Sequence, residues 1–243
     1  MATILDRYGI KEVADVTFYT INDVGQPGVP VLYLDTLKVS TIEQTAESSE
    51  ARGGKGNAAL ISWDYGKEIT VTLEDALYSA KSLALMFGDI DQDGKPIVPP
   101  KETKTIKKTL WKQNMNADNV SATINGMEVT LSTPKYYKAD GTDGTTDDYA
   151  YVCGDVTLKD SYTIDVSANG FPGTYYITGD TYARSETTGK DEFFQFIIPK
   201  AKVLAESNTI TLEAEGDPTV FSMNLKVLRP KDGVMMKLVQ YTV

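Results

Sequence analysis

Apolar and polar residues alternate with a period of two along most of this sequence, which is the pattern of half-buried β-strands. The clearest case is the segment VSATINGMEVTL, residues 120–131. If Asn125 and Gly126 form a two-residue turn, the apolar residues of both arms share one face. Asn-Gly is the preferred pair for such a turn, because both positions need a positive φ. The pattern therefore predicts a β-hairpin at 120–131.

Comparable alternation recurs along the rest of the chain, so we expect a mainly β protein. It predicts strands near residues 13–21, 31–40, 61–65, 69–73, 104–112, 150–158, 161–167, 173–179, 193–199, 210–214 and 221–227, with turns at 66–67 and 215–218. The last segment, VMMKLVQYTV at 234–243, is apolar at positions that face both sides of a strand. Such a strand is either central in a sheet or covered by a neighbouring subunit.

One segment, EDALYSAKSLALMFG at 74–88, has helical spacing instead. Its apolar stripe consists of Ala76, Ala80, Leu83 and Phe87. Glu74 and Asp75 suit the first turn of a helix over the whole segment, and Gly88 suits its C-terminal cap. Ser79 could instead cap a shorter helix. We therefore expect one flanking α-helix and leave both starting points open.

Two long polar segments interrupt the strand pattern. Residues 41–57 contain one large apolar residue, Ile42, and residues 133–149 contain four aspartates and two glycines. Structureless loops longer than ~12–15 residues are uncommon inside compact domains and are usually functional or disordered. We expect 41–57 to be a loop that is mobile in an isolated subunit and docks on a partner. Residues 133–149 are expected to be a decorated loop or a small insertion.

Composition narrows the functional classes. The chain has 243 residues, a net charge of −10, one cysteine and no histidine. A lone Cys153 forms no internal disulfide, which suits a reducing cytoplasm. Without histidine the chain lacks the usual general base near neutral pH and the commonest transition-metal ligand. Its acidity opposes binding to nucleic-acid phosphates. We expect no export signal in the charged N-terminal segment and no membrane span.

Two motifs invite ligand-binding interpretations. The run from Arg52 to Asn57 resembles a phosphate loop, but Lys55 is followed by Gly56 instead of the required Ser or Thr. The run from Asp89 through Asp91 and Asp93 to Gly94 matches the opening of an EF-hand calcium loop, whereas Pro100 stands where the bidentate Glu should be. Asp-Gly turns explain the same letters. We therefore predict no cofactor, no metal and no catalytic residues.

Three segments together resemble the tail tube, or major tail, proteins of long-tailed bacteriophages. They are EARGGKGNAALISWDYGKEITVTLEDAL at 50–77, NGFPGTYYITGDTYARSETTGKDEFFQFIIPKAKV at 169–203 and EGDPTVFSMNLKVLRPKDGVMMKL at 215–238. The resemblance implies one domain over 1–243, with a β-sandwich or barrel-like core and one flanking helix. It also implies hexameric rings that stack into a tube around a DNA-conducting lumen.

The same resemblance assigns partners and surfaces. It implies a virion protein, made in the cytoplasm of a bacterial host, that assembles with itself and other tail proteins while DNA passes without specific binding. The expected subunit interface is formed by the polar loop and the last strand, at Glu50, Arg52, Gly53, Gly54, Lys55, Gly56, Asn57, Met235, Val239 and Tyr241.

Two other functions stay open. One is another tail or baseplate structural protein of related fold. The other, from a different class, is a β-sandwich carbohydrate-binding module. Its stacking platform would consist of Trp63, Trp111, Tyr175 and Tyr176. Aromatic residues at alternating strand positions are, however, more often part of a core.

Overall fold

The computed structural model describes residues 7–206, 208–210 and 219–241. The protein is mainly β, with 58% of residues in strands and 5% in helices, as the alternation predicted. The chain divides into two compact units. The main unit consists of residues 1–98 and 164–243, and the inserted unit of residues 99–163. Residues 133–149 all lie in the inserted unit, and the single domain over 1–243 stays a prediction.

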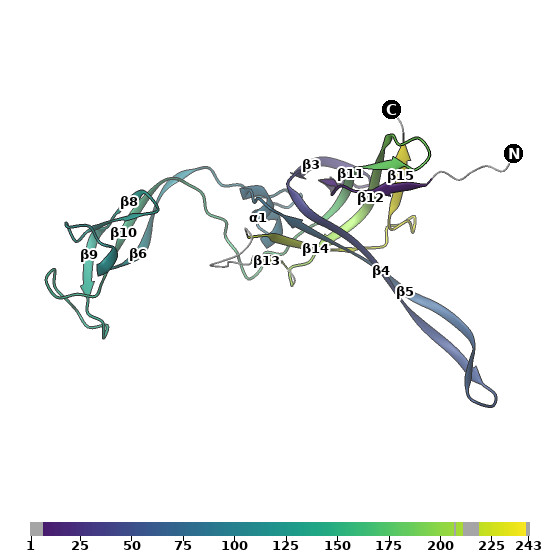
Figure 1. Cartoon of the computed structure of the whole chain (residues 1–243), viewed down its shortest axis with the longest axis horizontal. Helices are drawn as coiled ribbons and strands as arrows, with labels where there is room; N and C mark the ends of the chain where they lie inside the picture. The colour runs from purple at the N-terminus through teal and green to yellow at the C-terminus, as the bar shows by residue number, and fades with distance from the viewer. Residues whose placement is uncertain (1–6, 207, 211–218, 242–243) are drawn as a thin grey trace. The chain divides into compact units, whose positions relative to one another are not determined.

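The main unit is built on one ten-stranded antiparallel sheet and one helix (Figure 1). Its elements are β1 Tyr8–Ile10, β2 Asp15–Ile21, β3 Pro27–Leu34, β4 Leu37–Gly53, β5 Ala58–Asp75, α1 Ala80–Phe87, β11 Thr174–Ser185, β12 Asp191–Val203, β13 Thr209–Ile210, β14 Phe221–Val227 and β15 Lys237–Tyr241. The strand order is β3-β2-β11-β12-β14-β5-β4, with β1 paired to β11, β13 to β14 and β15 to β12.

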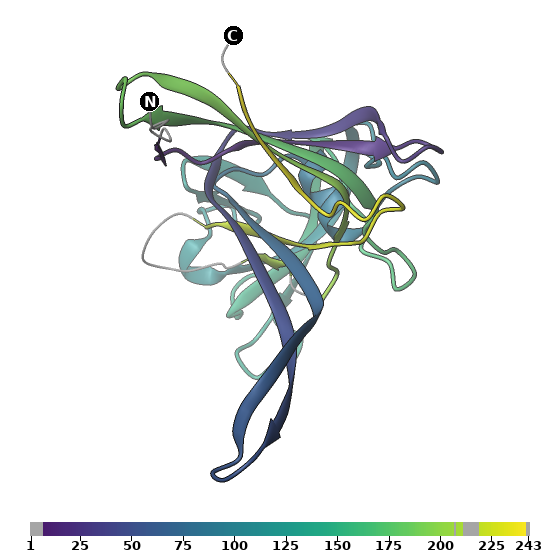
Figure 2. The same cartoon turned by 90° about the vertical axis from the view of Figure 1, so that its right-hand side faces the viewer.

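The sheet curls around a single core, so its two ends face each other as in a β-sandwich (Figure 2). Phe18 on β2 and Leu73 on β5 are both buried in this core, although their strands lie far apart in the sheet order. Leu85 of α1 packs into the same core. Each fully buried large apolar side chain stabilises the fold by about 1.5–3 kcal/mol.

The helix begins at Ala80, so its start at Glu74 was wrong and the alternative cap at Ser79 is confirmed. The Ser79 hydroxyl accepts a hydrogen bond from the Ser82 backbone N–H at 3.0 Å, and the Ser79 N–H donates to the Ser82 hydroxyl at 2.8 Å. Glu74 is drawn into β5 instead, where it pairs with Ser222 of β14. Gly88 caps the other end at a φ of 80°.

The expected loop at 41–57 is also wrong, because residues 41–53 belong to β4 and only 54–57 form a turn. Apart from Ile42, which packs against the core, the segment has little apolar surface to bury, but its backbone pairs with β5, with two bulges, up to Gly53 opposite Ala58. Two further predictions need correction. Residues 61–65 and 69–73 belong to the same strand, β5, so the turn predicted at 66–67 does not form. Of the strand predicted at 161–167, only Ser161, the last residue of β10, is in a strand. In that stretch Tyr162 and Val166 are exposed. The strand at 210–214 and the turn at 215–218 fall largely outside the described residues.

The inserted unit has its own small core. It contains β6 Glu102–Trp111, the 3-10 helix η1 Lys112–Asn114, β7 Ser121–Ile124, β8 Met127–Thr130, β9 Ser132–Tyr137 and β10 Tyr151–Ser161. β6, β10 and β9 form one sheet and β7 with β8 the predicted hairpin. Asn125 and Gly126 take the positive φ values that the turn requires, so this prediction is confirmed. Val152 is fully buried between the two layers.

Candidate assembly surfaces

The β4–β5 hairpin extends well beyond the core of the main unit (Figures 1 and 2). Ile69, Val71 and Leu73 of β5 are buried, whereas every residue from Ala58 to Glu68 is exposed. Up to the pair Thr45–Glu68, therefore, the hairpin is part of the curled sheet. Beyond that pair it is a free two-stranded ribbon with two solvent-facing sides.

A β-bulge at Gly66 separates these two parts. Thr45 pairs with Glu68 and Glu47 pairs with Tyr65, so β5 advances by three residues where β4 advances by two. Gly66 has a φ of 64°, a conformation that favours glycine. Side chains of a strand point alternately to its two faces, and the extra residue shifts this alternation by one. The odd-numbered residues of β5 therefore lie on one face before the bulge and on the other face after it. Tyr65 consequently lies on the side of the ribbon opposite to that of Ile69.

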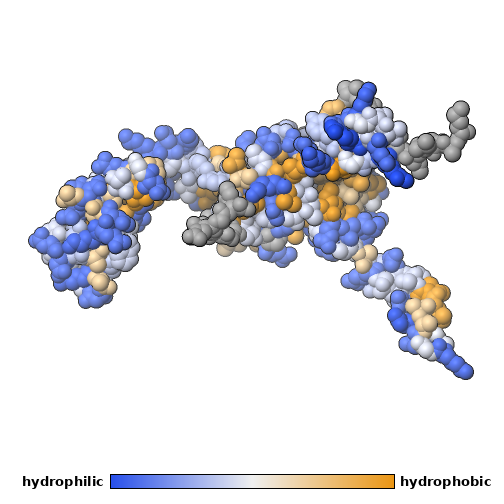
Figure 3. Space-filling view, in the orientation of Figure 1, coloured by the Kyte–Doolittle hydropathy of each residue, from blue (hydrophilic) through white to orange (hydrophobic). Residues whose placement is uncertain are grey.

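An apolar stripe results on the free part of the hairpin. It consists of Ile61, Trp63 and Tyr65, each 54% exposed. The residues across from them on β4 are Ala51, Ser49 and Glu47, two of them too small to cover aromatic or branched side chains. Figure 3 shows apolar surface gathered on this protruding hairpin. A stripe of this kind, standing away from the core, is typical of a surface that another protein covers.

The predicted interface residues of the polar segment all lie at the tip of this hairpin. Glu50, Arg52 and Gly53 end β4, and residues 54–57 form the turn. The guanidinium of Arg52 lies 2.6 Å from the carboxylate of Glu50, so this arginine pairs within its own strand. Lys55 makes no ion pair with any residue of the described parts of the chain. The predicted residues thus lie together on one hairpin, their role as an interface stays a prediction, and the sequence reasoning missed the stripe beside them.

The predicted residues of the last segment are split between core and surface. Met235 packs against the core of the main unit, so it does not offer a free surface. Val239 and Tyr241 lie on β15, which among the described strands pairs only with β12 and is exposed along its whole length. Tyr241 stacks on Phe193 with ring centroids 5.3 Å apart. β15 therefore presents an edge whose backbone can pair with another strand.

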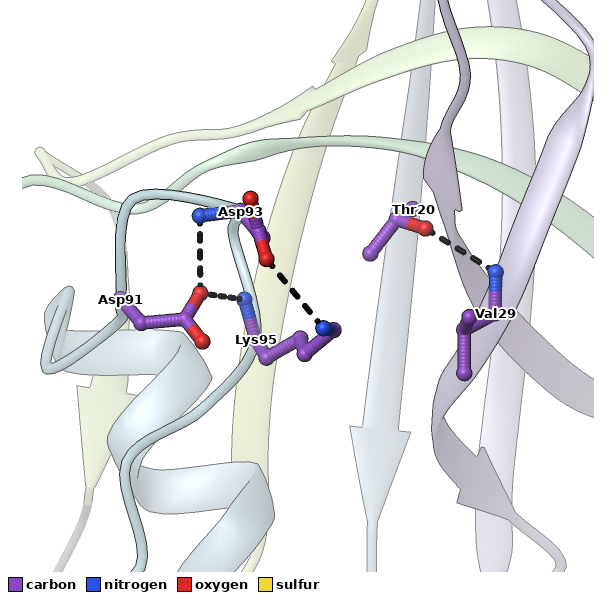
Figure 4. A network of polar contacts seen from close by, with 5 residues as sticks. All are labelled: Thr20, Val29, Asp91, Asp93 and Lys95. Carbon is purple, nitrogen blue, oxygen red and sulfur yellow. Dashed lines mark hydrogen bonds and ion pairs between the residues drawn. The ribbon is translucent and has the colours of Figure 1, made fainter.

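The acidic run at 89–94 is a closed turn and shows no ligand set. The Asp91 carboxylate accepts hydrogen bonds from the backbone N–H groups of Asp93 and Lys95, at 2.9 and 2.8 Å (Figure 4). The Lys95 ammonium lies 3.3 Å from the carboxylate of Asp93. Among the residues that the structure describes, no group of three or more acidic or cysteine side chains gathers to hold a metal.

The carbohydrate platform of four aromatic residues, which the sequence left open as an alternative, is not formed. Tyr175 is fully buried, where it meets Phe18 edge-on and donates its hydroxyl to the Gly94 carbonyl at 2.8 Å. Burial raises its pKa to about 12. Tyr176, the next residue along β11, packs edge-on against Tyr19. Trp63 belongs to the hairpin and Trp111 to the inserted unit, and with Tyr175 buried in the core the four side chains do not form one exposed platform.

Comparison with known proteins gives one family. The model of the YomU/Tube protein family matches residues 8–240, which is almost the whole chain. A comparison with curated proteins gives no match. In the described parts of the chain no helix is long and apolar enough to cross a membrane. The match spans the main unit with its hairpin and the inserted unit alike, and the chain therefore belongs to the YomU/Tube protein family, a family of phage tail tube proteins.

Proposed function

We propose that this protein is a structural subunit of a phage tail tube, without catalysis or cofactor. Copies form hexameric rings, the rings stack, and DNA passes through the lumen without specific binding. The observation that carries this proposal is the free half of the β4–β5 hairpin, with Ile61, Trp63 and Tyr65 largely exposed. An apolar ribbon that buries nothing in its own subunit gains stability when a second copy covers it.

Two further observations support the proposal. The β15 edge, apolar at Leu238, Val239 and Tyr241, can be completed by a strand of a neighbouring copy, which removes the aggregation hazard of an open edge. A net charge of −10 opposes retention of DNA in a lumen. Assembly with other tail proteins and a place in the virion tail accord with the family.

Electron microscopy of concentrated, purified protein tests this function. Six-fold rings or stacked tubes are expected, and a dispersed monomer at every concentration and salt condition contradicts the proposal. A trimmed variant, in which Asn-Gly replaces residues 46–67, joins the paired residues Thr45 and Glu68 by a two-residue turn. It removes only exposed or half-exposed residues, so it should fold normally and form no tubes.

A further inference from the structure

A concave pocket of about 460 Å³ lies in the main unit, away from the residues of the hairpin. Its walls come from the turn between β2 and β3, the start of β11, the C-terminal part of β12 and the segment before β15. Apolar parts of the wall are supplied by Ile21, Val24, Pro199, Pro230 and the ring of Tyr176. A volume of this size is in the range of ligand-binding clefts, roughly 300–1,000 Å³.

The turn that forms one wall is held by its own hydrogen bonds. The Asn22 side-chain oxygen accepts from the backbone N–H groups of Val24 and Gln26, at 3.2 and 2.8 Å. At the base of the same turn, the Val29 N–H donates to the Thr20 hydroxyl at 3.0 Å (Figure 4). The wall is thus formed before anything binds, which lowers the entropic cost of binding.

The pocket is strongly cationic for so acidic a protein. Four basic side chains line it, namely Lys200, Arg229, Lys231 and Lys237, against two acidic ones, Asp23 and Asp232. None of the four cations forms an ion pair with a residue in the described ranges. The pocket therefore selects an occupant that brings carboxylates. Its mixed charges and apolar walls are closer to a protein interface than to a groove for a phosphate polymer.

The free half of the hairpin has the complementary chemistry. Its apolar stripe suits the apolar walls, and Glu47 lies on the same face as the stripe, opposite Tyr65. Glu47 is the one charged residue of this face between the bulge and the pair Ala51–Ile61, and it forms no ion pair with any described residue. The ring of Trp63 can also attract a lysine or arginine side chain through its face. No residue of the hairpin lines the pocket of its own chain, so the pocket is left open for another copy.

We propose that this pocket receives the free half of the β4–β5 hairpin from a second copy of the chain. The contact rests on the proposed tube function and names the surface that the hairpin meets. It joins two different patches, so it is heterologous, and repeated contacts of this kind close into rings or continue as an open stack. The Glu47 carboxylate of one copy thereby offsets part of the positive charge that the other copy leaves unpaired.

Two complementary variants of the full chain test the proposal. The pocket variant carries Arg229→Glu and Lys231→Glu, both at exposed positions, and the hairpin variant carries Trp63→Thr and Glu47→Lys. Each should raise the concentration needed for assembly at least about tenfold, because like charges then meet across the contact. A matched control, Lys81→Glu with Lys190→Glu, makes the same charge change at exposed sites outside the pocket and should assemble as the parent does.

Mixing the two variants distinguishes one shared contact from two separate ones. The pocket variant retains an intact hairpin and the hairpin variant an intact pocket. A tagged pocket variant should therefore capture the hairpin variant better than it captures untagged pocket variant. Equal capture of both, or normal assembly of the pocket variant, overturns this inference while the tube function stands. A parent chain that never assembles overturns both.

Discussion

Glu47 lies directly opposite Tyr65 in the β4–β5 hairpin, whereas two residues earlier on β4 Thr45 lies opposite Glu68. The extra residue of β5 between these pairs decides which side of the ribbon carries the apolar stripe. A regular hairpin with the same composition would direct Ile61, Trp63 and Tyr65 to the same side as the core residues of β5. The bulge turns them to the other side, where each of them is 54% exposed.

Inserting one alanine between Ala46 and Glu47 should therefore impair assembly without unfolding the protein. The insertion gives β4 the residue that it lacks opposite the bulge, so pairing becomes regular and the stripe moves to the face that carries Ile69. We expect an unchanged melting temperature, within a few degrees, and an assembly concentration raised at least about tenfold, which corresponds to about 1.4 kcal/mol per contact. Sedimentation velocity over a concentration series measures the effect. Unaltered assembly of the insertion variant would show that the orientation of the stripe is irrelevant.

The β15 strand gives a second prediction about assembly. Truncation after Arg229 removes this strand and should abolish rings and tubes. Because the truncation also removes Met235 from the core, a milder variant is needed. Leu238→Lys changes a side chain that is 59% exposed and leaves the pairing with β12 in place. It should fold with little change in stability yet assemble poorly, as electron microscopy can check, and normal tubes from this variant would remove β15 from the interface.

The turn at 89–94 should be independent of calcium. Asp91 uses its carboxylate to accept two backbone N–H groups, so Asp91→Ala should lower stability by about 1 kcal/mol. Thermal unfolding of the parent should not shift with millimolar calcium or with a chelator. A rise of several degrees in calcium would instead restore Asp89, Asp91 and Asp93 as ligands, because a ligand that binds only the native state stabilises it.

Tyr175 should make stability fall at alkaline pH. Its pKa is about 12 in the folded protein and ~10 in an unfolded chain. Between these values the folded state keeps a proton that the unfolded state has lost, so the free energy of unfolding decreases as pH rises through this window. Tyr175→Phe should cost about 1 kcal/mol below pH ~10, by loss of the bond to Gly94, and should show a shallower decline above it. Denaturant titrations from neutral to alkaline pH compare the two proteins, and parallel declines would contradict the assignment.

Local signals in the sequence predicted local structure well. The hairpin at 120–131 follows from Asn125 and Gly126 and from alternation on both arms, none of which depends on distant residues. The helix start was harder, because Glu74 suits both a first helical turn and the strand that pairs with β14. That pairing partner lies far along the chain, and no local pattern shows it.

The polar segment at 41–57, which forms most of β4 and the turn after it, shows why polar strands are hard to predict from sequence. Hydrophobic periodicity detects a strand only where one face is buried, and Glu47, Ser48 and Ser49 are exposed on both faces. Their strand is held by backbone pairing with β5. The sequence analysis predicted interface residues at the tip, from Glu50 to Asn57. It placed Ile61 and Tyr65 in an ordinary half-buried strand, because alternation alone does not show that both faces of that strand are exposed. Gly66 was interpreted as a turn, although glycine inside a strand pattern also marks a bulge.

The fluorescence of Trp63 tests most directly whether the hairpin is the assembly element. The chain has two tryptophans, so Trp111→Phe leaves Trp63 as the only strong reporter. Its indole is 54% exposed in the single subunit and should emit as a solvated side chain. As the concentration rises and rings or tubes appear in the electron microscope, we expect its emission to shift to shorter wavelength and its quenching by iodide to fall in parallel. Tubes that form while the emission and quenching of Trp63 stay unchanged would contradict the account.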